Sequence, residues 1–182
     1  MPAQITVSPT DHPLQGFYRW ERERANQVFL TQPVGKGLVH DITWGEAGHQ
    51  VRHMAAWLQS QGWPAGSRVA ILGKNSAHWI LADLAIQMAG HVSIPIYPTF
   101  NAETLCYILQ HSEARACFVG KMDDTLSLQS GVPEGVQLLT LPLAPTGLAG
   151  GLRWDDLVAQ ASALAGEPAP DFDAICTIIY TS

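Results

Sequence analysis

Basic side chains are scarce in this sequence. Lysine occurs only at positions 36, 74 and 121 of 182 residues, and the formal net charge is −6. Residues 19–24 mix three arginines with two glutamates, which is typical of a solvated helix face. Proteins that bind nucleic acid need clustered Lys and Arg side chains to neutralise phosphates. Because the lysines do not cluster along the sequence, no nucleic-acid partner is predicted.

Cysteine is also rare. The chain has Cys106, Cys117 and Cys176, each among apolar neighbours and none in a Cys-x-x-Cys pair. An odd number without paired spacing argues against a disulfide framework. It favours reduced, buried thiols, and we therefore expect a cytoplasmic location.

Long hydrophobic runs and a targeting segment are missing too. No apolar run approaches the roughly 20 residues that a transmembrane helix needs. Residues 1–13 have neither a basic start nor an apolar core, so no signal peptide is predicted and a flexible lead-in is expected. The composition, 47% hydrophobic and 14% charged, is that of a globular protein. A chain so poor in charge is expected either to have little surface to cover or to bury part of its surface against another body.

What the sequence does contain is an alternation of short apolar runs and amphipathic segments. The apolar runs predict strands at 69–72, 92–96, 116–119 and 136–140. Helical periodicity predicts helices at 14–26, 77–89, 102–111 and 155–164, and one more that ends at Gly62. This alternation indicates an α/β fold, with a parallel, Rossmann-like sheet and flanking helices.

Local signals mark where several helices begin. Thr43 and Glu46 have the spacing of a capping box. Asn75 or Ser76 can cap the helix that follows them, and Asn101 can cap another. These side chains predict helix starts at their own positions.

Turn residues divide the rest of the chain. Runs at 28–31 and 38–42 predict an N-terminal hairpin around the turn 33–37, a loop longer than the tightest types. The stretches 141–151 and 166–173 are rich in Pro or Gly and predict loops.

Two histidines and two pairs of aspartates have spacings that could indicate a functional site. A structural role explains each of them better. His49 and His53 have the i, i+4 spacing that can bind zinc, but Gln50 stands where a metalloprotease helix has glutamate. We interpret both as surface histidines. The pairs 123–124 and 155–156 fall near expected helix starts, where carboxylates act as caps. No metal site, activated nucleophile or P-loop is predicted.

Residues 174–182 hold the strongest local candidate for a binding site. The run 174–180 is typical of a buried strand, and Thr181 and Ser182 follow it. Phosphate-binding loops form where such a strand ends, because outward-facing N–H groups and small hydroxyl side chains let a phosphate approach. An ordinary strand end is the alternative, and these residues alone do not decide between the two.

Three segments taken together resemble the adenylate-forming (AMP-binding) enzymes, and within them the long-chain fatty acyl-CoA synthetases. They are 67–79 (SRVAILGKNSAHW), 87–99 (QMAGHVSIPIYPT) and 174–182 (AICTIIYTS), in the order and spacing of that family. Two departures are modest: Ser67 stands where the family often has Asp, and Cys176 where it often has a smaller residue. The resemblance implies that 14–182 is the N-terminal portion of the large AMP-binding domain. It also implies that most of the phosphate loop and the C-terminal domain are not in this sequence.

The resemblance also implies a reaction. In that family a carboxylate attacks the α-phosphate of ATP, giving an acyl-adenylate and pyrophosphate, and the thiol of coenzyme A then displaces AMP. ATP, Mg²⁺, coenzyme A and a long-chain fatty acid are the implied ligands. Thr181 and Ser182 are implied to contact the β- and γ-phosphates of ATP with support from Tyr180, and no catalytic residue or metal ligand is implied. These 182 residues alone are expected to be inactive.

Other interpretations stay open. The chain can be a non-enzymatic α/β binding or interaction module, or part of a ligase for an aryl or medium-chain acid. Peripheral membrane association and homodimerisation are left open as well. Four residues of the matched segments, Asn75, Pro95, Tyr97 and Pro98, are expected to shape the fold rather than to act in chemistry, because turn residues usually serve backbone geometry.

Overall fold

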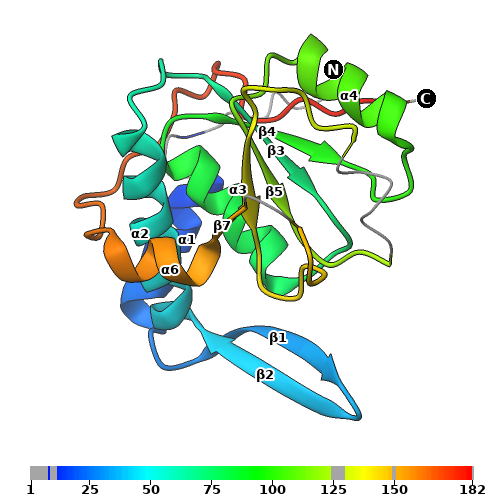
Figure 1. The fold of residues 1–182 in the computed structure, drawn as a ribbon. Helices are drawn as coiled ribbons and strands as arrows, with labels where there is room; N and C mark the ends of the chain where they lie inside the picture. The colour runs from blue at the N-terminus through cyan, green and yellow to red at the C-terminus, as the bar shows by residue number, and fades with distance from the viewer. Residues whose placement is uncertain (1–7, 9–11, 124–129, 149–150, 182) are drawn as a thin grey trace, which may run out of the picture.

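A five-stranded parallel sheet forms the centre of the structure (Figure 1), a computed structural model that describes residues 8, 12–123, 130–148 and 151–181. Its strands lie in the order β4-β3-β5-β6-β7. They are β3 (Arg68–Leu72), β4 (Val92–Ile96), β5 (Ala116–Val119), β6 (Gln137–Thr140) and β7 (Leu152–Arg153). All four neighbouring pairs are parallel, which confirms the predicted α/β fold. The short β7 follows the predicted loop 141–151 and was not predicted.

Helices cover the two faces of the sheet unequally. On one face lie α1 (Pro13–Glu23), α2 (Trp44–Ser60), α3 (Ala77–Met88) and α6 (Trp154–Gln160), and α4 (Ala102–His111) lies on the other. Alternate residues of a strand point to opposite faces. Val69 and Ile71 of β3 therefore join the larger core, while Ala70 and Leu72 join the core beneath α4. Both faces are apolar because both are covered.

The predicted helix caps are present. Thr43 Oγ1 accepts from the Glu46 amide at 3.2 Å, and the Glu46 carboxylate accepts from the Thr43 amide at 2.8 Å, so the capping box is complete. Ser76, not Asn75, caps α3 by accepting from the Trp79 amide at 3.2 Å. Asn101 caps α4 by accepting from the Thr104 amide at 2.8 Å. Side chains thus satisfy amides that a helix start leaves without partners.

The hairpin is longer and its turn tighter than predicted. Antiparallel β1 (Val28–Gly35) and β2 (Leu38–Thr43) stay paired up to Gly35 and Leu38, so the loop has two residues. Lys36 and Gly37 have φ angles of 52° and 74°, the left-handed values that a tight type I′ turn needs. The hairpin projects from the body (Figure 1). Midway along β1, Gln32 is buried and accepts a 2.8 Å hydrogen bond from the Ala77 amide of α3.

The chain between α6 and its last segment is fastened to α1 and α2. Arg52 of α2 forms two hydrogen bonds with the Glu21 carboxylate, at 2.8 and 2.7 Å. The same guanidinium donates to the carbonyls of Leu164 and Gly166, at 3.2 and 2.7 Å. Helix α6 ends at Gln160, earlier than predicted, and the chain then crosses to this clamp. One planar cation thereby joins three segments that are distant in sequence.

The predicted lead-in 1–13 lies largely outside the described residues. Within it, His12 Nδ1 caps α1 by accepting from the Leu14 amide at 3.2 Å. Among the described helices, none combines the length and apolar character needed to cross a bilayer.

Candidate functional site

The carboxyl ends of parallel strands meet at one edge of the sheet, which is where open α/β sheets bind ligands. Leu72 of β3 is in register with Ile96 of β4 and with Val119 of β5. The three strands therefore end at the same level. The loops that leave them begin at Gly73, Tyr97 and Gly120 and form this edge.

The ends of β3 and β5 approach each other closely. The Gly120 amide donates to the Leu72 carbonyl at 2.8 Å, and the Lys74 amide donates to the Lys121 carbonyl at 2.8 Å. A Cβ atom at Gly73 would lie 3.1 Å from the Cα of Gly120. Glycine at these positions lets the two backbones run side by side past the ends of their strands. The lysines that follow the two glycines are thus brought together.

A cavity of about 630 Å³ opens at this edge of the sheet. Its lining residues come from four segments: Gly73, Lys74, Asn75, Trp79, Pro95, Ile96, Tyr97, Pro98, Lys121 and Ile179. Apolar and aromatic side chains make most of the wall, and two of the three lysines of the chain stand in it. The cavity combines a nonpolar wall with two ammonium groups.

The two lysines differ in their surroundings. Lys74 Nζ lies 2.5 Å from the Asp123 carboxylate, an ion pair with exposed side chains. Exposed pairs of this kind hold their partners weakly. Lys121 is exposed and forms no ion pair with another described residue. Lys121 therefore brings an unpaired positive charge to the cavity wall, in a chain whose net charge is −6.

Sequence reasoning missed this pair, because 46 residues separate the two lysines and they were described as not clustering. A signal was nevertheless present. Each lysine follows a glycine that itself follows a predicted strand, in Leu72-Gly73-Lys74 and in Val119-Gly120-Lys121. Parallel strands that end alike place such residues at the same edge.

The segment before Thr181 is extended but is not the buried strand that the sequence predicted. It pairs with β4 through one parallel bridge, between Ser93 and Thr177. Ile175 and Ile179 are 66% and 60% exposed, while Ile178 packs on the core beneath α4. The prediction was wrong because the segment lies at the outer edge of the sheet, where one of its sides has no described neighbour.

The predicted phosphate-contacting residues lie near the cavity only in part. The segment runs in the direction of β4, and Ile179 reaches the cavity wall. Tyr180 packs on the core beneath α4, and its hydroxyl lies 2.8 Å from His111 Nδ1. Thr181 is exposed, and Ser182 lies outside the described residues. Burial raises the pKa of Tyr180 above its usual value, so the phenol stays protonated at neutral pH.

The four residues expected to shape the fold, Asn75, Pro95, Tyr97 and Pro98, all line the cavity. Tyr97 is 58% exposed and packs edge-on against Phe100, with ring centroids 5.6 Å apart. Their role in shaping the fold stays a prediction. Their position makes them part of the wall as well.

The described residues of the aspartate pairs and the histidine pair lie on helices or in ion pairs, and not in a common site. Asp155 and Asp156 lie in the first turn of α6, near a helix start as predicted, but neither caps it, because the N-cap position is Arg153 and no side chain makes a cap hydrogen bond. Asp123 pairs with Lys74, and residue 124 lies outside the described residues. His49 and His53 lie on α2 with ring centroids 4.0 Å apart. Within the described residues, no group of three or more His, Cys, Asp or Glu could hold a metal ion.

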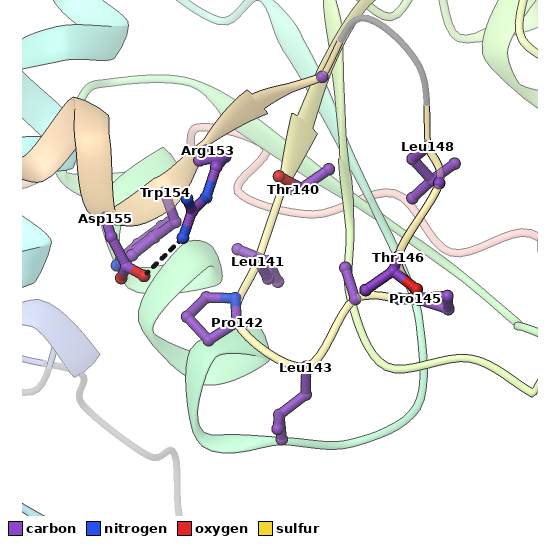
Figure 2. A pocket seen from close by; sticks show the side chains of 13 residues that line it. Thr140, Leu141, Pro142, Leu143, Pro145, Thr146, Leu148, Arg153, Trp154 and Asp155 are labelled. Atoms are coloured by element: carbon purple, nitrogen blue, oxygen red, sulfur yellow. Dashed lines mark ion pairs between the residues drawn. The ribbon is translucent and has the colours of Figure 1, made fainter.

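A second hollow of about 430 Å³ lies beyond the end of β6 (Figure 2). Leu141, Pro142, Leu143 and other apolar residues make most of its wall. Arg153 is its one cation among the described lining residues, and it lies 3.9 Å from the Asp155 carboxylate. The cation of this hollow has a carboxylate partner in the same wall, whereas Lys121 of the first cavity forms no ion pair with another described residue, so the hollow is the weaker candidate for binding an anion.

Comparison with known proteins connects this architecture to a family. The family model described as "AMP-binding enzyme" matches residues 17–182. A curated relative, the long-chain-fatty-acid–CoA ligase FadD15 of Mycobacterium bovis, is 36% identical over 118 residues, which are 65% of this chain and 20% of the relative. The chain thus spans about a fifth of that relative's length.

Two solved structures share the fold. An anthranilate CoA ligase, AuaEII, in complex with anthranoyl-AMP has a TM-score of 0.78 at 20% identity, over 94% of this chain and 32% of that one. A benzoate CoA ligase from Burkholderia xenovorans LB400 has a TM-score of 0.73 at 21% identity, over 91% of this chain and 32% of that one. At such identities the likeness concerns the fold alone.

Proposed function

The chain belongs to the AMP-binding enzyme family, and from this we propose that the protein carrying it is an AMP-forming ligase that joins a long-chain fatty acid to coenzyme A. In the proposed reaction a carboxylate oxygen attacks the α-phosphate of ATP, and pyrophosphate leaves. The coenzyme A thiol then attacks the carbonyl of the acyl-adenylate, a thioester forms, AMP leaves and the thiol proton is lost. The relative FadD15 is named for such an activity.

The observation that carries the proposal is the pair Lys74 and Lys121 in one cavity at the carboxyl edge of the sheet. Both phosphate-bearing substrates of the reaction, ATP and coenzyme A, are polyanions with an adenine ring. Ammonium groups bind phosphate oxygens, and the exposed ring of Tyr97 offers a stacking surface. We propose that this cavity receives the phosphates of one of these nucleotides.

Thr181 and Ser182 belong to the same proposal as the first residues that contact the β- and γ-phosphates of ATP, and Tyr180 as their support. What supports it is the direction of the segment, which runs with β4 to Ile179 at the cavity wall. Small hydroxyl residues at the end of an extended segment allow close approach of a phosphate.

Magnesium ions usually accompany the phosphates of ATP. The cavity presents two ammonium groups, and no Asp or Glu is among its described lining residues. These residues do not form a magnesium site, so no step of the reaction is derived through the metal here.

An aryl acid is the second candidate substrate. It is favoured by the likeness of the fold to the anthranilate and benzoate CoA ligases, whereas the sequence relative favours a fatty acid. A non-enzymatic binding module is a third reading, and the same assay tests it.

The test is an assay on the native polypeptide that carries this sequence, purified through a tag placed at its N-terminus. Exchange of labelled pyrophosphate into ATP is measured with palmitate, with benzoate and without acid, and thioester formation is then measured with coenzyme A. We expect palmitate to drive both steps. Exchange driven by benzoate and not by palmitate would contradict the long-chain assignment. The absence of any acid-dependent exchange would contradict the proposed ligase activity.

A further inference from the structure

The chain around Tyr180 is held to the sheet by few backbone contacts. The Ser93 amide donates to the Cys176 carbonyl, and the Ile178 amide donates to the Ser93 carbonyl, both at 3.0 Å. Within the described residues, Ile178 makes the last backbone hydrogen bond of this segment. The position of Tyr180 and Thr181 therefore depends on side chains.

The side chain that fulfils this role is His111, the last residue of α4. Its Nδ1 lies 2.8 Å from the Tyr180 hydroxyl, and the two rings pack edge-on with centroids 5.8 Å apart. Tyr107, one turn earlier on α4, stacks on the same imidazole with ring centroids 5.3 Å apart. The imidazole thus packs against two aromatic rings.

The end of α4 is a firm support for this contact. Ser112, the C-cap residue, donates from its hydroxyl to the Ile108 carbonyl at 2.7 Å. Arg68 of β3 donates to the Ser112 carbonyl at 2.6 Å, so the helix end is fastened to a central strand. The position of His111 at this helix end is therefore fixed relative to the sheet.

We propose that His111 is a positioning residue for phosphate binding: it holds the hydroxyl of Tyr180 and thereby fixes where Thr181 meets the nucleotide. The inference rests on the proposed function, because it needs Thr181 to contact ATP. The inference adds His111 to the residues proposed for phosphate binding. His111 lies 69 positions before Tyr180, on a helix that contacts the segment through this side chain.

The hydrogen bond does not depend on one protonation state of the imidazole. A neutral ring with a bare Nδ1 accepts from the phenolic O–H, and a protonated ring donates to the phenolic oxygen. Replacing the imidazole by an apolar ring removes the hydrogen bond. His111→Phe keeps the aromatic packing and loses the nitrogen, whereas His111→Gln keeps a polar group that can bond the hydroxyl.

The first readout is hydrogen exchange of the Ile178 amide in the native polypeptide, which reports the segment whether or not the protein is a ligase. We expect exchange about threefold to tenfold faster in His111→Phe, the factor for a lost hydrogen bond. His111→Gln is expected to restore the parent rate, and His40→Phe, on the exposed hairpin, to leave it unchanged. An unchanged rate in His111→Phe would overturn the inference.

The second readout is kinetic. We expect His111→Phe to raise KM for ATP about threefold to tenfold and to leave KM for the acid as in the parent. Tyr180→Phe should have at least this effect, because it also removes the interaction of the hydroxyl with Ser112. Adding His111→Phe to Tyr180→Phe should raise KM no further, since the bond is already lost. An active parent with an unchanged KM for ATP in His111→Phe would overturn the positioning role. An inactive parent would instead overturn the proposed function.

Discussion

The amide of Lys74 donates a 2.8 Å hydrogen bond to the carbonyl of Lys121. This bond joins the second residues of two loops that leave neighbouring strands, and both side chains line one cavity. The ligand chemistry of the site therefore depends on a backbone contact between positions that sequence alone does not connect.

Removing the charge of Lys121 is expected to weaken nucleotide binding. A hydrogen bond to a charged group contributes about 1.5–3 kcal/mol, so Lys121→Ala should raise the Kd of the bound nucleotide about tenfold or more. Calorimetry with ATP and, separately, with coenzyme A identifies which nucleotide is affected. Lys36→Ala is the matched control, because it removes the same charge from the hairpin turn, outside the cavity. Equal losses in both variants would mean that only net charge matters.

A side chain at position 73 is expected to destabilise the fold. The added methyl of Gly73→Ala would lie 3.1–3.2 Å from backbone atoms of Gly120, which cannot rotate away. Overpacking of this kind costs about 1–3 kcal/mol, measurable by urea unfolding. Gly16→Ala is the control: nothing lies within 4 Å of its Cβ, and alanine favours the α1 helix. It should raise the free energy of unfolding, and a similar gain at position 73 would contradict the close approach of the two loops.

Arg52 is expected to be irreplaceable by lysine. Its guanidinium bonds Glu21 twice and two carbonyls as well, and a single ammonium cannot reproduce this planar arrangement. Arg52→Lys should lower the free energy of unfolding by about 1–3 kcal/mol. Arg153→Lys, at an exposed pair with Asp155, should change it by less than about 0.5 kcal/mol. Equal effects in the two variants would show that the clamp adds nothing beyond charge.

Stability is expected to fall in mildly acidic solution because of His78. Its Nε2 lies 3.1 Å from Gln50 Oε1, and burial lowers its pKa below the usual value of 6.5, although the Asp155 carboxylate opposes this and His40 reinforces it. The unfolded chain then binds the proton more readily than the folded one. Stability is therefore fully present above about pH 6.5 and declines as pH falls toward the folded pKa.

Chemical unfolding at pH 7.5, 6.5 and 5.5 measures this decline. His78→Gln removes the titrating group and should flatten the pH dependence, whereas the surface change His49→Gln should leave its slope as in the parent. The slope does not vanish entirely, because burial also lowers the pKa of His91. A His78→Gln protein with the parent slope would refute this assignment.

Much of the local structure follows from sequence because its causes are local. Thr43, Ser76 and Asn101 cap helices with side chains that reach amides three residues away. Four of the five strands of the sheet could be recognised from short apolar runs. The family could be recognised from three segments, two of which contain β3 and β4 with the loops that follow them. Residues 36 and 37 show the limit: their neighbours predicted a turn, but cross-strand pairing up to Gly35 set its length.

Sequence by itself determined most of the helices and four of the five sheet strands, because spacing, caps and turn residues act within a few positions. Only the tertiary structure decided which strands are neighbours. β3 lies between β4 and β5, so Lys74 faces Lys121 across 46 intervening residues. It also decided that Ile175 and Ile179 stay exposed, since burial depends on what covers the edge of the sheet and not on how apolar the segment is. The contact between His111 and Tyr180 has the same origin, because a helix and a distant extended segment meet only after the sheet has assembled.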